Sequence, residues 1–318
     1  TAMIIIGSLT AVSLEKLKRK DLLLGFLLVE GLLTNVGGLL TLISSVPNII
    51  VGKTAGISFA RFFLVAAPYV AVSTAATLFL GKWRFGIQSL STEQEKAEAR
   101  ELVAGFDENE SVPSKNFFWM SIAVLILFIG TLAGQAALPW NLDQLGMGFV
   151  ALFFAGVMLL AYRHEVDKYY AAVDWDLLAF FAGLFVVIYV MEQALVLDLI
   201  GKGISYMLAW PVKLASASLL TSAAIASSVT DNIPLAAVLA KILKGIAVPA
   251  DSPLWWSVIF GANLGGNITP IGSASTVVAM TLIHKQKLPL NFVSFVTTAA
   301  PFAALQILLA ILYVVIVL

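Results

Sequence analysis

The chain has 318 residues, of which 60% are hydrophobic and 12% are charged, and its mean hydropathy is +0.95. Soluble proteins carry about 25% charged residues, so this composition predicts a polytopic membrane protein. The 19 basic and 19 acidic residues cancel, so nothing indicates a nucleic-acid partner or electrostatic recruitment to a membrane surface. Because the chain contains no cysteine, disulfides, thiolate metal sites and thiol catalysis within it are excluded.

Apolar runs of about 20 residues or more predict the membrane-spanning segments. In chain order, spans are expected at 21–52, 58–80, 116–138, 145–162, 175–200, 252–283 and 290–318. The run at 203–246 has two apolar arms that meet at a polar tip between Ser227 and Pro234. Its second arm is too short to cross a bilayer, which favours a re-entrant hairpin. The alternative is one kinked span followed by a short interfacial helix.

The runs 21–52 and 252–283 share one pattern, an asparagine followed by two glycines and a threonine. The matching residues lie 228 positions apart: Asn35 and Asn263, Gly37 and Gly265, Gly38 and Gly266, Thr41 and Thr269. The constant separation indicates an internal duplication. Paired glycines are poor helix sequence, so we predict two half-helices joined by unwound backbone in each run. A long tilted helix is the alternative, but it gives the glycines and Pro270 no role.

The order of these segments predicts two repeats of inverted topology. Residues 1–84 would hold the rest of the first repeat: the second arm of a hairpin, the broken helix 21–52 and the span 58–80. Residues 85–115 would form a polar linker, placed on the cytoplasmic side by the basic residues of neighbouring loops. The second repeat would occupy 116–318. Thr1 sits about where Pro234 does, so we expect roughly 100 to 130 residues before it in the intact protein.

Asp231 is the strongest candidate for chemistry, because a carboxylate at membrane depth normally faces a cavity, an ion or a partner. Asn232 and Thr230 add neutral oxygens that can replace a cation's hydration shell or hydrogen-bond an oxyanion. The predicted site joins this tip to both breaks and comprises Thr34, Asn35, Gly37, Gly38, Thr41, Asn48, Thr230, Asp231, Asn232, Asn263, Gly265, Gly266, Asn267, Thr269 and Ser273. Sodium is expected at Asp231, Asn232, Asn263 and Asn35. Asp231 and Glu30 are the candidate proton carriers, with local capping as the alternative role of Glu30.

Three motifs resemble those of the ArsB/NhaD permeases of the ion transporter superfamily: Thr34 to Gly52, Ser228 to Pro234, and Gly261 to Ser273. The segment Val173-Asp174-Trp175, with Phe180-Phe181 and Glu192, is similar to another recurrent segment of that family. The resemblance covers essentially the whole chain. It implies an elevator-type or rocking transporter, often a dimer, whose hairpin tips and broken helices form the site. That family includes sodium/proton antiporters, arsenite exporters and P-protein-like permeases.

We therefore predict an all-α, multi-pass, ion-coupled secondary transporter rather than an enzyme. The first hypothesis is a sodium/proton antiporter in which Asp231 alternately binds cation and proton. The alternatives are an exporter of arsenite or another anion or oxyanion and, from a different class, an ion channel or a non-transporting membrane scaffold. No cofactor is expected beyond the transported or coupling ion. Expected partners are a small ion, the lipid bilayer and a second copy in a homodimer, in the bacterial inner membrane or an organelle membrane derived from it.

Overall fold

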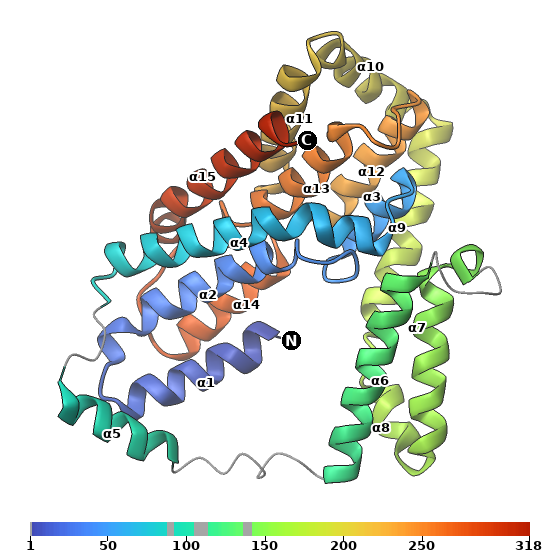
Figure 1. Cartoon of the computed structure of the whole chain (residues 1–318). Coiled ribbons are helices and arrows are strands. Elements are labelled where there is room, and N and C mark those ends of the chain that lie inside the picture. Colours follow the sequence, from blue (N-terminus) through green and yellow to red (C-terminus); the bar gives the residue numbers. More distant parts are fainter. Residues whose placement is uncertain (1, 88–91, 105–113, 136–141) are drawn as a thin grey trace. The chain divides into compact units, whose positions relative to one another are not determined.

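The computed structural model describes all residues except 1, 88–91, 105–113 and 136–141 (Figure 1). The described residues form helices and connecting loops, with no strand among them. The elements are α1 (Ala2–Lys16), η1 (Lys20–Leu22), α2 (Leu23–Gly37), α3 (Val46–Ala55), α4 (Phe59–Arg84), α5 (Glu93–Ala104), α6 (Lys115–Gly134), α7 (Leu142–Ala161), η2 (Arg163–Glu165), α8 (Val166–Ala171), α9 (Trp175–Gln193), α10 (Val196–Leu208), α11 (Val212–Ser227), α12 (Asn232–Gly245), α13 (Pro253–Gly265), α14 (Ala274–Lys285) and α15 (Phe292–Ile316).

Four of the described helices, α4, α6, α9 and α15, are long and apolar enough to cross a membrane. A bent pair makes a fifth candidate: Leu145–Ala161 and Arg163–Ala171 meet at an angle of 95°. Helices α2 and α13 are too short to cross alone, with 15 and 13 residues. The all-helical polytopic architecture predicted from the composition is therefore present.

The chain divides into two compact units. One comprises Thr1–Ile57, Arg61–Leu102 and Ile188–Leu318, and the other comprises Ser58–Ala60 and Val103–Val187. In the second unit, α6 packs against α7, and α8 follows the sharp bend at η2. The polar network described below lies entirely in the first unit.

Helix α13 lies at the centre of the first unit, and every residue from Leu254 to Gly265 is buried. It packs against α11, α12, α15 and α3 (Figure 1). A second apolar cluster joins α1 and α2 to α14 and α15, with Leu27, Leu32 and Phe302 fully enclosed. Because lipid chains are as apolar as these side chains, the cluster is held together by close van der Waals packing between the helices. The contacts around α13 fix one interrupted helix, and the cluster that joins α1, α2, α14 and α15 fixes the other.

Local sequence explains where the helices begin. Ser252 caps α13 by accepting a hydrogen bond from Leu254 N, and Pro253 takes the first helical position. Asp231 caps α12 in the same way through Ile233 N. These caps place the polar residues of the loops at helix N-termini.

One boundary differs from the expected spans. The apolar run 175–200 is divided, since α9 ends at Gln193 and α10 begins at Val196. Leu195, between them, has a left-handed backbone with φ of 59°, which stops the helix. Residues 203–208 of the expected hairpin run 203–246 therefore belong to α10, and the next helix, α11, begins at Val212. The apolar periodicity of the sequence continues past the end of α9, so this periodicity does not predict where α9 ends.

The polar linker expected at 85–115 contains one described helix, α5. Its remaining residues at 88–91 and 105–113 lie outside the described part of the chain, as does the end of the expected span 116–138. Helix α6 begins at Lys115 after the cap residue Ser114.

Candidate polar network between two helix breaks

Both Asn-X-Gly-Gly sequences, in which X is Val36 or Leu264, lie where a helix ends. Helix α2 ends at Gly37 and α3 begins at Val46, whereas α13 ends at Gly265 and α14 begins at Ala274. The first residues after each helix, Gly38 and Gly266, have nearly the same backbone conformation, with φ of −59° in both and ψ of −18° and −14°. None of these four glycines has a positive φ. The chain is thus interrupted at both predicted places, but not because the glycines adopt left-handed conformations.

Gly265 is needed for close packing against α11. A Cβ atom at Gly265 would lie 2.2 Å from the backbone oxygen of Ala224 and 2.7 Å from Ser227 Cβ. One turn earlier, a Cβ at Gly261 would lie 2.6 Å from the backbone oxygen of Leu220. Glycines four residues apart allow two helices to approach closely in this way. Such contact fixes α13 against the first arm of the α11–α12 pair.

The two breaks exchange hydrogen bonds reciprocally. Asn35 Nδ2 donates to Ser273 Oγ at 2.8 Å, and Ser45 Oγ donates to Asn263 Oδ1 at 2.7 Å. Asn35 corresponds to Asn263, and Ser45 to Ser273, at the separation of 228 positions. Each asparagine therefore contacts the serine that precedes the second half-helix of the other break. An approximate twofold relation between the two segments accounts for both bonds.

A second pair of bonds obeys the same relation. Asn48 Nδ2 donates to Gly38 O at 2.8 Å, and Thr276 Oγ1 shares its one proton between Gly266 O at 3.3 Å and Ser273 O at 2.8 Å. Positions 48 and 276 again lie 228 apart. Asn48 also accepts from Asn263 Nδ2 at 3.0 Å and donates to Thr41 O at 3.0 Å. The bonds to Gly38 O and Gly266 O satisfy backbone carbonyls at the two helix ends.

Asn267 extends the network to the neighbouring helices. Its Oδ1 accepts from Asn35 at 2.8 Å, and its Nδ2 donates to Leu32 O at 3.1 Å and to Gln306 Oε1 at 2.7 Å. Gln306, on α15, donates in turn to Thr77 Oγ1 on α4 at 3.0 Å. Gln306 was not among the residues predicted from the sequence, where the only signal is a lone amide in a long apolar run; the structure shows that it is fully buried.

The reciprocal contacts predict equal energetic coupling. Alanine substitution at Asn35 and Ser273, singly and together, forms one double-mutant cycle, and substitution at Asn263 and Ser45 forms its symmetry mate. We expect each single change to destabilise the protein by about 1–3 kcal/mol, because a buried polar partner loses its bond. Coupling of about 0.5–3 kcal/mol is expected in both cycles. Thermal unfolding in detergent measures it, and coupling confined to one cycle would contradict the reciprocity.

The predicted hairpin tip lies beside the second break. Thr269 Oγ1 donates to Ser228 O at 2.5 Å, and Ser227 Oγ donates to Ala262 O at 2.6 Å. Asp231 is exposed, and its Oδ1 accepts from Ile233 N at 2.9 Å. Within the described residues, Asp231 Oδ2 and the side chain of Asn232 make no hydrogen bond. The tip thus presents a carboxylate oxygen and an amide that are available to a ligand.

The remaining predicted residues are less directly joined to the network. Thr34 donates to Glu30 O at 2.8 Å, and Thr230 donates to Ala226 O at 2.8 Å, so both hydroxyls bond within their own helical turns. Thr41 bonds to Ser44 in the first break. Gly37 is exposed, and a Cβ there would meet nothing within 4 Å.

Glu30 is placed apart, against α1. Thr10 Oγ1 donates to Glu30 Oε1 at 2.5 Å, whereas the buried Oε2 has no partner within the described residues. The carboxylate lines a cavity of about 420 Å³ together with Lys82 of α4. The structure therefore gives Glu30 a cavity and one hydroxyl partner, and does not bring it into contact with the asparagines.

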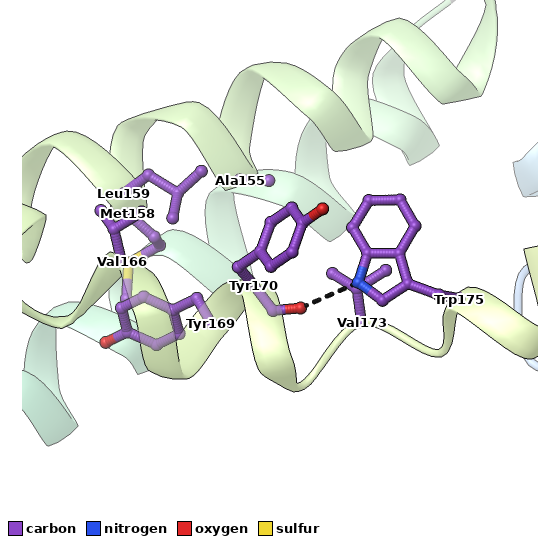
Figure 2. Close-up of a pocket in the computed structure, with 8 residues that line it drawn as sticks. All are labelled: Ala155, Met158, Leu159, Val166, Tyr169, Tyr170, Val173 and Trp175. Carbon is purple, nitrogen blue, oxygen red and sulfur yellow. Dashed lines mark hydrogen bonds between the residues drawn. The ribbon is translucent and has the colours of Figure 1, made fainter.

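A different cavity, in the second unit, is apolar and lacks this chemistry. Its volume is about 350 Å³, and Figure 2 shows Tyr169, Tyr170 and Trp175 on its wall with Met158. Trp175 Nε1 donates to Tyr170 O at 3.2 Å (Figure 2). Aromatic residues of this kind are enriched where a membrane meets water. The polar network, not this cavity, carries the ligand groups expected of an ion site.

The family of the chain follows from comparison with known proteins. A family model described as "CitMHS: Citrate transporter" matches residues 1–261. The chain belongs to the CitMHS family. It is accordingly an integral, multi-pass membrane transporter and not an enzyme, which confirms the coarser prediction from the sequence. The narrower resemblance to ArsB/NhaD permeases stays a prediction.

Microbial relatives of this CitMHS protein are described as transporters. It is 27% identical to an "uncharacterized transporter" of Mycobacterium bovis, over 98% of this chain and 71% of the relative. An "uncharacterized transporter" of Synechocystis is 26% identical, over 88% and 65% of the two lengths. The human P protein is 24% identical over 86% of this chain and 42% of its own length. The chain thus spans about two thirds of the microbial relatives and less than half of the P protein.

Proposed function

We propose that this protein is an ion-coupled secondary transporter that exchanges sodium for protons by alternating access. The observation that carries the proposal is the composition of the polar network: its described hydrogen-bonding groups are amides, hydroxyls and backbone carbonyls, with the Asp231 carboxylate at the adjoining tip. Neutral oxygens with one carboxylate are hard ligands, the kind that bind alkali and alkaline-earth cations. No Lys, Arg or His side chain hydrogen-bonds to this network within the described part of the chain.

Asp231 is the proposed site at which cation and proton compete. Its free carboxylate oxygen and the Asn232 amide would bind the ion, while Asn35 and Asn263 would complete the site from the two breaks. Binding of either a cation or a proton neutralises the carboxylate, so the site crosses the membrane only when occupied. Glu30 is the second proposed proton carrier, because its carboxylate lines a cavity of its own.

The reciprocal bonds support a proposed architecture of inverted repeats. Residues 1–84 would belong to the first repeat, 85–115 to a cytoplasmic linker and 116–318 to the second repeat. In this arrangement α11 and α12 form a re-entrant hairpin, and the breaks meet near the bilayer midplane. The relationship to ArsB/NhaD permeases, a homodimer and a bacterial inner-membrane location are further parts of the proposal. Within that family, the similarity to the human P protein supports a place in the P-protein-like branch.

Transport of an anion or oxyanion stays the second candidate, and citrate joins arsenite as a candidate substrate. The family description names citrate, and one local feature favours an anion. Ser45 precedes α3, yet its hydroxyl bonds to Asn263 and does not cap that helix. The first backbone N–H groups of α3 therefore lack a side-chain cap, and helix N-termini attract anions. Citrate, as a trianion, would still need a bound cation beside it, because the described polar network contains no basic side chain.

Flux measurements on the full-length protein in proteoliposomes distinguish these functions. Vesicles containing a pH-sensitive dye are exposed to a sodium gradient, to the same gradient of potassium, and to a citrate gradient. Antiport predicts a pH change evoked by sodium and absent from protein-free vesicles. Citrate uptake without any sodium-evoked proton movement would overturn the antiport proposal and favour the second candidate. Conduction without coupling would place the protein among channels.

A further inference from the structure

Helix α10 presents three distinct faces. Leu197, Gly201 and Ile204 are buried, and α10 packs against α11 and α12. Asp198, Lys202 and Ser205 follow at spacings of four and three residues and therefore share a second, polar face. The third face is apolar and exposed, as shown by the exposed fractions of 70% for Leu199 and 75% for Tyr206.

The polar face of α10 lines a cavity of about 340 Å³ against α12. Asp198, Lys202 and Ser205 form one wall, and Lys241 of α12 forms part of the other. Lys241 makes an ion pair with Glu192, at the end of α9, which also lines the cavity. All of these residues belong to the first unit. Two carboxylates and two ammonium groups thus border the same small space.

Of the two acid–base pairs that border the cavity, only Lys241 and Glu192 form an ion pair within the described residues. Lys241 and Glu192 neutralise each other, whereas neither Asp198 nor Lys202 has an ion pair or hydrogen bond within the described residues. They lie one helical turn apart and line the same cavity. An occupant with one positive and one negative group would satisfy both, with Ser205 as an additional hydrogen-bonding group.

The exposed apolar face identifies the surroundings of this cavity. An amphipathic helix of a membrane protein lies at the interface, with its apolar side chains against lipid chains. Leu199 and Tyr206 are therefore in position to contact acyl chains next to the cavity. Its occupant is thus expected to combine a zwitterionic head with an apolar tail.

We propose that the α10–α12 cavity binds the headgroup of a phospholipid with a primary ammonium group, as in phosphatidylethanolamine. Asp198 accepts hydrogen bonds from the ammonium, Lys202 and Ser205 bind the phosphate, and the acyl chains run along Leu199 and Tyr206. A trimethylated headgroup has no N–H to donate to Asp198. A lipid with a net negative charge leaves Asp198 unmatched. This inference requires only that the protein lies in a membrane and is independent of the proposed ion exchange.

Native mass spectrometry of the delipidated, detergent-purified protein tests the proposal. Phosphatidylethanolamine, phosphatidylcholine and phosphatidylglycerol of identical acyl chains are titrated separately. We expect the ethanolamine lipid to bind at least about tenfold more tightly than the choline lipid, since a charge-assisted hydrogen bond is lost in the latter. Equal affinity for all three lipids would overturn the proposal.

Two variants locate the binding. Asp198→Asn is expected to remove the preference for ethanolamine over choline and to leave phosphatidylglycerol binding no weaker. Lys202→Gln is expected to weaken the ethanolamine and glycerol lipids together, because both carry the phosphate. Lys244→Gln changes an exposed lysine of α12 outside this cavity and serves as the matched control. A preference for ethanolamine that survives Asp198→Asn, in protein with an unchanged unfolding temperature, would contradict the assignment.

Discussion

Asp231→Asn is expected to eliminate sodium-evoked proton movement while leaving the fold intact. Asparagine is as good a helix N-cap as aspartate, so the bond to Ile233 N that begins α12 is kept. The substitution therefore removes the negative charge and little else. Loss of a charged ligand costs about 1.5–3 kcal/mol, which weakens cation binding by roughly 10- to 150-fold. Because an amide cannot take up and release a proton, exchange should fall further than sodium binding does.

The matched control is Asp251→Asn, the same change in the exposed loop between α12 and α13. It should transport as the unchanged protein does. Reconstituted protein would be compared at equal protein-to-lipid ratio, with sodium binding and proton flux measured separately. Undiminished sodium-evoked proton exchange by Asp231→Asn would contradict the proposal that this carboxylate binds the cation and the proton. Sodium binding retained with lost exchange would show that Asp231 carries the proton and that the cation binds elsewhere.

Gly265→Ala is expected to disrupt the fold of the first unit. The new methyl group would lie 2.2 Å from the backbone oxygen of Ala224, a contact that no side-chain rotation can relieve. Helices α11 and α13 would have to separate, and the hydrogen bonds from Ser227 to Ala262 and from Thr269 to Ser228 would be strained. Overpacking of this kind destabilises by about 3 kcal/mol at the upper end of its usual range. Heating in detergent, followed by size-exclusion chromatography, measures the loss of folded protein.

Gly245→Ala provides the control for helix propensity. Gly245 is the last residue of α12, and a Cβ there meets nothing within 4 Å. This change should alter the stability by no more than about 0.5 kcal/mol. Equal thermal stability of the two variants would contradict the close approach of α11 and α13.

The sequence was sufficient to place both interruptions, because Asn-X-Gly-Gly is unusual in an apolar run. It was also sufficient to select Asn35, Asn48, Asn267 and Ser273, which the structure joins in one network. Their partners could not be assigned, since a hydrogen bond between positions more than 200 residues apart leaves no local trace. Nothing in the sequence indicated the second role of Gly265, which is to permit the close contact of α13 with α11.

Two further structural features, the end of α9 and the role of Gln306, could not be predicted from the sequence motifs. The end of α9 depends on the left-handed backbone of Leu195, a residue type that gives no indication of such a conformation. Gln306 was overlooked because it stands alone in a long apolar helix, away from every motif. Its role becomes evident only when α15 is packed beside the second break.

The reciprocal bonds also have a consequence for biosynthesis. Asn35 is synthesised before its hydrogen-bond partners Asn267 and Ser273, which follow it by 232 and 238 positions. At about 5–20 residues per second, a ribosome needs roughly 12 to 48 seconds to supply them. During that interval the Asn35 amide, already synthesised within an apolar run, must be accommodated by water, lipid headgroups or the insertion machinery. The first break is therefore made early but completed late, and ribosome stalling before Asn267 would leave Asn35 without either of these partners.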